Sequence, residues 1–220
     1  EDNAQAIGCN YTFTDSSKKK TGVIGHIGTT SFYPSKNLGG FGDGGAIFTN
    51  DDVLANKMKM IANHGQNKKY YHELVGCNSR LDSIQAAILD IKLNYLDEYI
   101  VARRKAADFY DSAFARHSKI KTPFRAPYSY HAFHQYTLVL EGVDRNGLNQ
   151  FLADLKIPSM IYYPVPGHKQ KMFEQFNVAT QLMPVTDWLT ERVISLPMHT
   201  ELDEEQLNFI STKVLEYINK

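Results

Sequence analysis

Residues 31–45 read Ser-Phe-Tyr-Pro-Ser-Lys-Asn-Leu-Gly-Gly-Phe-Gly-Asp-Gly-Gly, and this stretch carries more chemistry than any other in the chain. The segment 27–33 leads into Lys36, and five glycines follow between Gly39 and Gly45. The pattern predicts a strand that ends in a turn, followed by backbone that can approach a ligand closely. A lysine held in such a partly desolvated place loses its charge readily and can form a Schiff base.

The same spacing also fits a surface lysine in a flexible loop whose glycines only turn the chain. The glycines do not match the phosphate-loop or dinucleotide-binding fingerprints, so a nucleotide-hydrolysing enzyme is a poor interpretation. Spacing alone therefore leaves Lys36 open between a covalent catalytic role and a solvated loop.

Composition narrows the class of protein. The 220 residues carry 24 basic and 24 acidic side chains, and this balance argues against nucleic-acid or membrane-surface binding driven by bulk charge. No apolar stretch approaches the roughly 18 residues that span a bilayer. Two cysteines far apart, Cys9 and Cys77, favour a reducing cytoplasm over a disulfide-built secreted protein. The first residue is Glu1 rather than Met, which suggests a piece of a longer chain.

Outward from the central stretch, periodicity and turn signals predict the following elements of the N-terminal part. They are a hairpin with an exposed polar tip within 9–28, strands at 27–33 and 45–49, a helix over 51–64 capped by Asp51 or Asp52, and an ordered loop over 66–78. A long helix over 81–115, with a bend near 95–100, is followed by a region in which strands and helices alternate. There we expect strands at 135–140 and 159–163 and helices at 145–155, 188–194 and 203–218.

Three further groups are candidates for chemistry. Asp2 could face a ligand, although a lone Asp is more often a cap or a solvated charge. The run 78–80, Asn-Ser-Arg, precedes the long helix and could direct donors at an anion, or could simply cap the helix. His131 and His134 are spaced i, i+3, but without a nearby Cys or carboxylate a metal site is improbable, and none is expected.

The order and spacing of several motifs resemble one known family. The motifs are Glu1-Asp2-x-Ala4-Gln5, Ser31-Phe32-Tyr33-Pro34-Ser35-Lys36-x-Leu38-Gly39, Gly42-Asp43-Gly44-Gly45, His64-Gly65, Gly76-x-Asn78-Ser79-Arg80-Leu81-Asp82, Gln85-Ala86-Ala87, Tyr163-Pro164 and Ser195-Leu196-Pro197-Met198-His199. They resemble the DegT/DnrJ/EryC1/StrS family of pyridoxal-phosphate (PLP) sugar aminotransferases, and they extend over essentially the whole chain.

The resemblance implies a role for each matched residue. Lys36 would bind the cofactor covalently and then move the proton between substrate and cofactor. Asp2 would keep the pyridine nitrogen protonated, so that the ring acts as an electron sink. Gln5 would lie at the ring edge, and Ser31 would donate to the phosphate. The remaining implied residues are Asn78 and Arg80, which would reach the active site of a neighbouring subunit in a homodimer, and Tyr163 and His168, which would line the sugar-nucleotide side.

The implied reaction is an amino transfer in two halves, from L-glutamate to a keto sugar attached to a nucleotide. Relatives with His in place of Lys36 are dehydratases, so the lysine favours transamination. The finer matches resemble enzymes that act at C3 of a UDP-linked 3-keto-hexuronate for surface polysaccharides. Tyr162 departs from that subgroup, where a histidine precedes Tyr163, so a dTDP-linked 3-keto-6-deoxyhexose stays open as the substrate.

The implied fold is α/β, a fold-type I PLP-dependent transferase of the aspartate aminotransferase type. Residues 1–98 would be the C-terminal part of its large domain and 99–220 a small α+β domain, joined by the long helix 81–115. The family's N-terminal part, with amides for the phosphate and an aromatic that stacks on the ring, has no counterpart here. Alternatives are a non-catalytic interaction module or another fold-type I activity, such as an aldolase or dehydratase.

Overall fold

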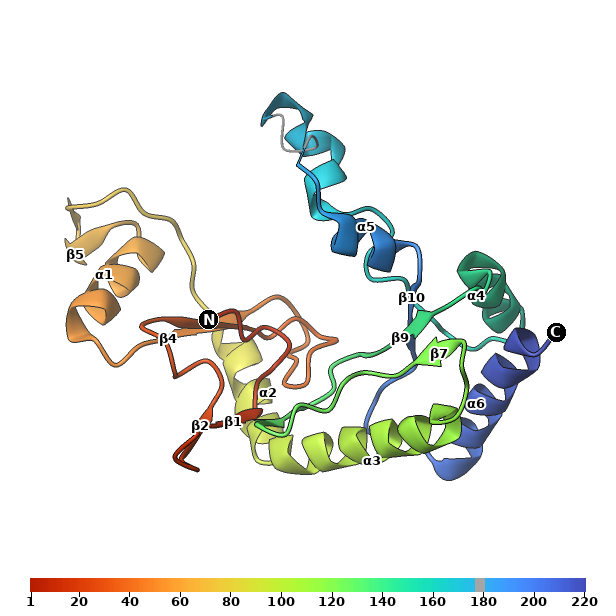
Figure 1. Cartoon of the computed structure of the whole chain (residues 1–220). Helices are drawn as coiled ribbons and strands as arrows, with labels where there is room; N and C mark the ends of the chain where they lie inside the picture. The colour runs from red at the N-terminus through yellow and green to blue at the C-terminus, as the bar shows by residue number, and fades with distance from the viewer. Residues whose placement is uncertain (177–180) are drawn as a thin grey trace. The chain divides into compact units, whose positions relative to one another are not determined.

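The computed structural model describes residues 1–176 and 181–220, and these fall into two compact units (Figure 1). The first unit contains Glu1–Arg104 and Ala126–His134. The second contains Lys105–Arg125 and Gln135–Lys220. Both mix helices with short strands, as the predicted α/β class requires.

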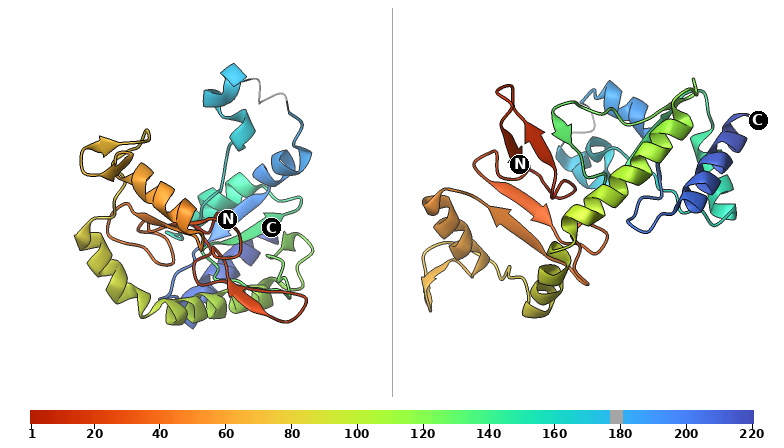
Figure 2. Two further views of the ribbon diagram at one scale, coloured as in Figure 1. Left: turned by 90° about the vertical axis from the view of Figure 1, so that its left-hand side faces the viewer. Right: turned by 90° about the horizontal axis from the view of Figure 1, so that it is seen from below.

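In the first unit, β3 (Gly28–Ser31) pairs antiparallel with β4 (Gly45–Phe48), and the two strands lie side by side in Figures 1 and 2. On the other side of β3, Asp2 forms a parallel bridge with Thr29. The Asn3 amide donates to the Thr29 carbonyl at 2.7 Å, and the Thr29 amide donates to the Glu1 carbonyl at 2.9 Å. The predicted strands at 27–33 and 45–49 are therefore confirmed, with shorter bounds.

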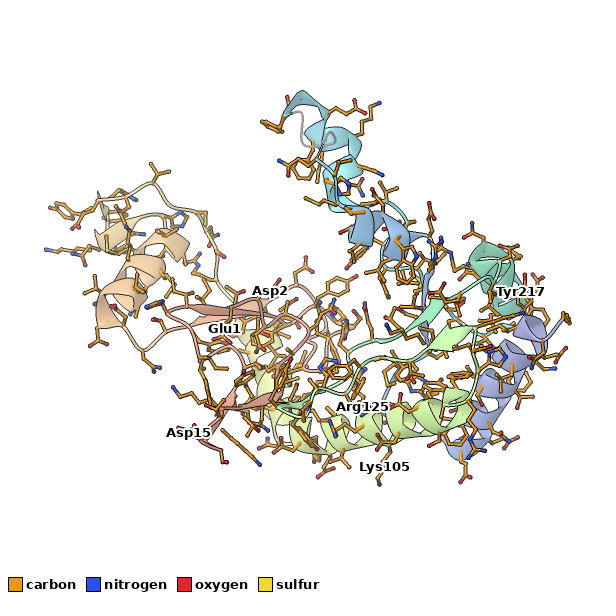
Figure 3. All side chains as sticks on the ribbon, in the orientation of Figure 1. Glu1, Asp2, Asp15, Lys105, Arg125 and Tyr217 are labelled. Atoms are coloured by element: carbon orange, nitrogen blue, oxygen red, sulfur yellow. The ribbon has the colours of Figure 1, made fainter. Side chains whose placement is uncertain are left out.

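The predicted hairpin is formed by β1 (Asn10–Thr12) and β2 (Lys18–Lys20). Its tip, which includes Asp15, is exposed (Figure 3). On the other edge of β1 lies β8 (Ser129–Tyr130), so segments more than 100 residues apart share one three-stranded sheet. This long-range pairing ties Ala126–His134 into the first unit.

The helix α1 (Asp52–Ala62) begins at the predicted cap, because the Asp51 carboxylate accepts from the amides of Val53 and Leu54. The following segment was predicted to be a loop, and that prediction was partly wrong. It contains a small hairpin of β5 (Gln66–Lys68) and β6 (Tyr71–His72). These strands are exposed on most positions and show no apolar alternation, so hydrophobic periodicity could not reveal them.

The predicted single helix over 81–115 is two helices, α2 (Ser83–Leu93) and α3 (Leu96–Phe114). Asn94 explains the break, since its side-chain amide donates to the Asp90 carbonyl at 2.8 Å. That carbonyl is the acceptor the Asn94 backbone amide would use in a continuous helix. The backbone amides of Asn94 and Tyr95 instead bond three residues back. The chain turns at this point in Figure 2, close to the predicted bend.

Buried residues of the first unit gather where the N-terminal segment meets α2 and the start of α3. The members of this core cluster are Cys9, Leu38, Leu89, Leu96, Ile100 and Ala132. Gly8, with φ of +85°, lies so close to Ile100 that a Cβ atom would sit 2.2 Å from its side chain. The loop after Lys36 is thus anchored to the core through Leu38.

The second unit is built on a three-stranded antiparallel sheet of order β10-β9-β7. The strands are β7 (Ile120–Lys121), β9 (Tyr136–Leu140) and β10 (Val193–Leu196), and the main helices are α4 (Arg145–Asp154), α5 (Pro184–Thr190) and α6 (Glu204–Ile218). Two short 3-10 helices, Gly167–Lys169 and Lys171–Phe176, precede the residues outside the described range. The predicted strand at 135–140 and helices at 145–155 and 203–218 are confirmed.

Two predictions in this unit were wrong. The segment 188–194 was predicted as a helix, but α5 ends at Thr190 and residues from Val193 on form β10. All four residues of β10 are buried, and a short apolar run buried on both faces cannot be told from a helix by periodicity. The segment 159–163 is no strand, since only Met160 bridges, to Ser195.

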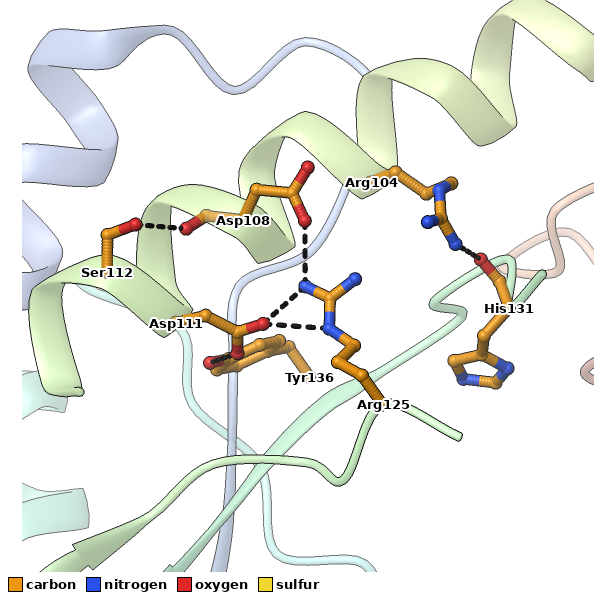
Figure 4. Close-up of polar contacts among 7 residues, drawn as sticks. All are labelled: Arg104, Asp108, Asp111, Ser112, Arg125, His131 and Tyr136. Atoms are coloured by element: carbon orange, nitrogen blue, oxygen red, sulfur yellow. Dashed lines mark hydrogen bonds and ion pairs between the residues drawn. The ribbon is translucent and has the colours of Figure 1, made fainter. Parts of the chain in front are cut away.

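A charged cluster ties the end of α3 to the segment before β9 (Figure 4). Arg125 donates from Nε to Asp111 Oδ2 at 2.7 Å, and its guanidinium also lies 3.0 Å from Asp108. The Tyr136 hydroxyl donates to Asp111 Oδ1 at 2.6 Å. Burial, followed by the Asp111 contact, raises the pKa of Tyr136 far above its ordinary value. Asp111 is therefore the shared acceptor of this cluster.

Within the part of the chain that the structure describes, none of the helices combines the length and apolar character needed to cross a bilayer.

Candidate functional site

Lys36 follows the end of β3 in a tight turn. Its backbone amide donates to the Tyr33 carbonyl at 2.8 Å, and the Gly40 amide donates to the Phe32 carbonyl at 2.8 Å. A Cβ atom on Gly39 would lie 2.4 Å from the Pro34 carbonyl oxygen, so this close approach of the chain to itself requires glycine. The Lys36 side chain is half-buried. The turn thus holds the lysine at the strand end, against the flexible-loop interpretation.

Asp2 borders β3, Ser31 is the last residue of that strand, and Lys36 follows it. Asp2 lies beside Thr29 in the parallel bridge, and Thr29 and Ser31 share one face of the strand because they are two residues apart. The Asp2 Oδ1 atom accepts from the Ala4 amide at 3.0 Å, and the residue is exposed (Figure 3). The Asp2 carboxylate and the Ser31 hydroxyl thus share one face of this strand pair, and Lys36 follows Ser31 by five residues.

Glu1 fixes the segment that carries Asp2. Its carboxylate accepts from the backbone amides of Gly22, Ile24 and Gly25 at 3.0, 2.6 and 2.6 Å. These bonds, that from Gly25 foremost, lower the pKa of Glu1. Three amide donors on one carboxylate leave Asp2 little freedom at the bridge.

Gln5 lies exposed in the turn that follows Asp2. Its side chain makes no hydrogen bond to residues 1–176 or 181–220, so its place at a ring edge stays a prediction.

Asn78 and Arg80 lie in exposed chain before α2. The backbone of this segment is held to the end of α1, through the Asn63–Asn78 bridge and the bond from the Ser79 amide to the Ala62 carbonyl at 2.9 Å. Capping of α2 is done by Asp82, whose carboxylate accepts from the Gln85 amide, and not by Asn78 or Ser79. Within the described residues, neither the Asn78 nor the Arg80 side chain makes a hydrogen bond or ion pair.

The second unit contains Tyr163 and His168. Tyr163 is 63% exposed and lines a hollow of about 440 Å³ with α5 residues, including Thr186 and Thr190. His168 is buried, and its Nε2 atom lies 3.5 Å from Asp187 Oδ1. Tyr163 is thus accessible to a ligand, whereas His168 faces a partner within its own unit. Substrate contacts of both residues stay predictions.

The environment of His134 differs from what the sequence indicated. His134 was considered only as a metal ligand, yet its pKa is lowered to about 4, by burial first and then by the charges of Lys36 and Arg103. No group of three or more His, Cys, Asp or Glu side chains within the described residues could hold a metal ion. Histidine spacing could not reveal this environment, because it depends on contacts across the fold.

A second hollow of the first unit, of about 770 Å³, lies between β4 and α1. Its lining is mainly small and apolar, and Lys59 is its titratable residue. Asp2, Ser31 and Lys36 do not line it.

Comparison with known proteins gives a consistent assignment. The chain is 42% identical over 219 residues to a pleiotropic regulatory protein of Geobacillus stearothermophilus, with 99% of this chain and 57% of that protein covered. It is 43% identical over 218 residues to UDP-N-acetyl-3-dehydro-alpha-D-glucosamine 3-aminotransferase of Acidithiobacillus ferrooxidans, with 97% and 55% covered. The chain thus spans little more than half the length of these relatives.

The fold comparison agrees. A crystal structure of a DegT DnrJ EryC1 StrS aminotransferase from Brucella abortus superposes with a TM-score of 0.90 at 38% identity. The match covers 100% of this chain and 57% of that one. Both the predicted family and the predicted fold-type I architecture are confirmed by these relationships. The sequence profile of this family matches residues 1–215, and the chain belongs to the DegT/DnrJ/EryC1/StrS aminotransferase family.

Proposed function

We propose that the protein containing these residues is a PLP-dependent aminotransferase that moves the amino group of L-glutamate to a nucleotide-linked keto sugar. The observation that carries the proposal is that Asp2 lies beside β3, Ser31 ends this strand and Lys36 lies in the tight turn that follows it. Membership of an aminotransferase family supports it.

The residues present fit the cofactor. A half-buried amine can bind its aldehyde, a carboxylate can face its basic ring nitrogen, and a hydroxyl can donate to its phosphate. The tight turn at Gly39 fixes the backbone that carries the amine. Each of the three reactive parts of PLP therefore has a matching side chain in the first unit.

Each residue has a distinct task in the proposed reaction. Pyridoxal phosphate, when bound, supplies an electron sink for the carbon that loses or gains a proton. The Asp2 carboxylate would hold the cofactor by its ring nitrogen, and its negative charge would favour the protonated form of that nitrogen. Lys36 holds the cofactor and carries the proton through its Nζ atom. Ser31 orients the phosphate by donating its hydroxyl hydrogen.

For the substrate we favour C3 of a UDP-linked 3-keto-hexuronate, in surface-polysaccharide or amino-sugar biosynthesis. A relative named UDP-2-acetamido-2-deoxy-3-oxo-D-glucuronate aminotransferase, from Pseudomonas aeruginosa, is 40% identical. A dTDP-3-amino-3,4,6-trideoxy-alpha-D-glucose transaminase of Streptomyces venezuelae is 35% identical and favours the alternative of a dTDP-linked deoxyhexose. The named activities of these relatives share amination of a nucleotide sugar, which is the firmer part of the proposal.

A homodimer with shared active sites completes the proposal. Asn78 and Arg80 are exposed and make no side-chain bond within the described residues, which suits a contribution to the site of a neighbouring subunit. Tyr163 and His168 would belong to the sugar-nucleotide side. The division into a large-domain part, 1–98, and a small domain, 99–220, and a cytoplasmic location belong to the same proposal.

The test uses the protein at full family length with its intact mass verified. We expect a yellow absorbance band that L-glutamate bleaches, and borohydride should fix the cofactor on Lys36, as located by peptide mapping. Lys36→Arg keeps the charge and should show neither band nor trapping. Absence of the band in the wild-type protein would refute the proposal and favour a non-catalytic interaction module. A band unaffected by glutamate, with the sugar nucleotide still consumed, would favour an aldolase or dehydratase.

A further inference from the structure

His134 presents a buried polar atom that the proposed reaction does not use. Its Nδ1 atom is buried and has no hydrogen-bond partner among residues 1–176 and 181–220. Buried side-chain polar atoms almost always have a partner in folded proteins, so such an exception calls for a functional explanation.

The structure brings the backbone of His134 close to the turn that carries Lys36. The Asn37 side-chain amide donates to the Ala132 carbonyl at 3.2 Å, and both residues are buried. Arg103 donates from NH1 to the carbonyls of Phe133 and His134 at 3.2 and 3.3 Å. The segment 132–134 is therefore fixed through its backbone on two sides, while the imidazole nitrogen Nδ1 stays available.

Burial first, and then the positive charges of Lys36 and Arg103, lower the pKa of His134 to about 4. The ring is neutral at neutral pH and keeps one nitrogen as a hydrogen-bond acceptor. Arg103 already donates to carbonyls. The Lys36 ammonium has three hydrogen-bond donors on a flexible stem, and within the described residues no side-chain bond of Lys36 is present.

We propose that Nδ1 of His134 accepts a hydrogen bond from the Lys36 amino group whenever that lysine is not bonded to the cofactor. His134 is thus a positioning residue. It keeps the free lysine beside the site, in place for proton transfer and for its return to the cofactor. The proposal rests on the proposed function, since it presumes that Lys36 alternates between bonded and free states.

The direct test is ¹⁵N NMR of histidine-labelled full-length protein loaded with pyridoxamine phosphate, in which Lys36 is free. We expect the His134 Nδ1 resonance of a neutral, unprotonated nitrogen, shifted upfield by several ppm relative to Lys36→Ala. The signals of His131 serve as the internal reference and should not move. An identical His134 resonance in Lys36→Ala, or a proton on Nδ1, would overturn the proposal.

Kinetics give a second readout. His134→Leu removes the acceptor and should lower kcat about tenfold with little change in KM, as loss of one charge-assisted hydrogen bond implies. His134→Gln keeps an acceptor and should stay within about threefold of wild type, with His131→Gln as the matched control. Equal losses in the Leu and Gln variants would contradict a hydrogen-bonding role.

The two proposals fail in different ways. If borohydride fixes no cofactor on Lys36, the aminotransferase proposal is wrong, and the NMR comparison in cofactor-free protein still reports the contact between lysine and histidine. If the cofactor is fixed on Lys36 but the His134 resonance is the same in wild type and Lys36→Ala, only the positioning role is wrong.

Discussion

At the scale of single residues, the lowered pKa of His134 predicts how the stability of the fold depends on pH. Its pKa falls from 6.5 to about 4 in the folded protein. Between these values the unfolded chain binds a proton at this position and the folded chain does not, so stability decreases as the pH falls through that window. Because the ring is only partly buried and solvent screens part of the effect, we expect the free energy of unfolding to decrease by about 1–2 kcal/mol across this window. Urea unfolding at pH 7 and pH 4.5 should show a smaller loss of stability in His134→Gln than in wild type.

The ionic contacts of Arg125 allow a second prediction at the scale of single residues, about stability. Asp111 accepts from both Arg125 and Tyr136 and its side chain is 27% exposed, whereas Asp108 contacts the same arginine at 65% exposure. Asp111→Asn should cost about 2–3 kcal/mol of unfolding free energy, because it leaves a partly buried cation poorly paired. Asp108→Asn should cost at most about 1 kcal/mol, as an exposed pair does. Equal costs, measured by urea unfolding, would show that Asp111 is not the shared acceptor.

At the scale of elements, the N-terminus of α6 is stabilised by reciprocal bonds. Asp203 accepts from the Gln206 amide at 2.7 Å, and the Gln206 side chain accepts from the Asp203 amide at 3.2 Å. The helix buries Val214 and other apolar residues, so fraying at its start weakens the whole second unit. Asp203→Ala should cost about 1 kcal/mol. Glu205→Ala, in the same turn without a capping bond, should cost about 0.3 kcal/mol, and urea unfolding separates the two.

Some helices and strands could be predicted from the sequence and others could not. The difference depends on whether an element has a local pattern of its own. The helices at 51–64, with a cap at Asp51 or Asp52, and at 203–218, and the strand at 135–140 carry local signals, and all three were predicted. The strand β10 could not be identified, because burial on both faces removes the alternation that marks a strand. The break at Asn94 depends on a side chain competing with the backbone, which helix periodicity ignores.

The residues of the candidate site also differ in how far the sequence alone could identify them. Lys36 stands out through its glycine neighbours, whereas Asp2 and Ser31 gained roles only through the family resemblance. The environment of His134 could not be predicted at all, since Arg103, Asn37 and His134 come from three distant segments. Contacts of this kind arise from the fold and leave no spacing in the sequence.

At the scale of the whole molecule, much apolar surface of the first unit is uncovered. No residue of α1 is buried, and α2 buries only Leu89. Ile84 and Ile91 are 74% and 64% exposed, and seven residues apart they lie on one face of α2. Large exposed apolar side chains on one helix face are typical of surfaces that pack against another part of the protein or a partner. Under the homodimer proposal, we expect this face of α2 to contact the second copy.

This expectation can be tested in the full-length protein by sedimentation. Ile84→Lys combined with Ile91→Lys should convert the dimer to monomer, because two charges would be buried against an apolar partner surface. Val53→Lys on α1, where the residue is 76% exposed, is the matched control and should leave the dimer intact. A double variant that remains dimeric but melts earlier would mean that this face packs inside the subunit. Loss of the dimer with an unchanged cofactor band on Lys36 would separate assembly from cofactor binding.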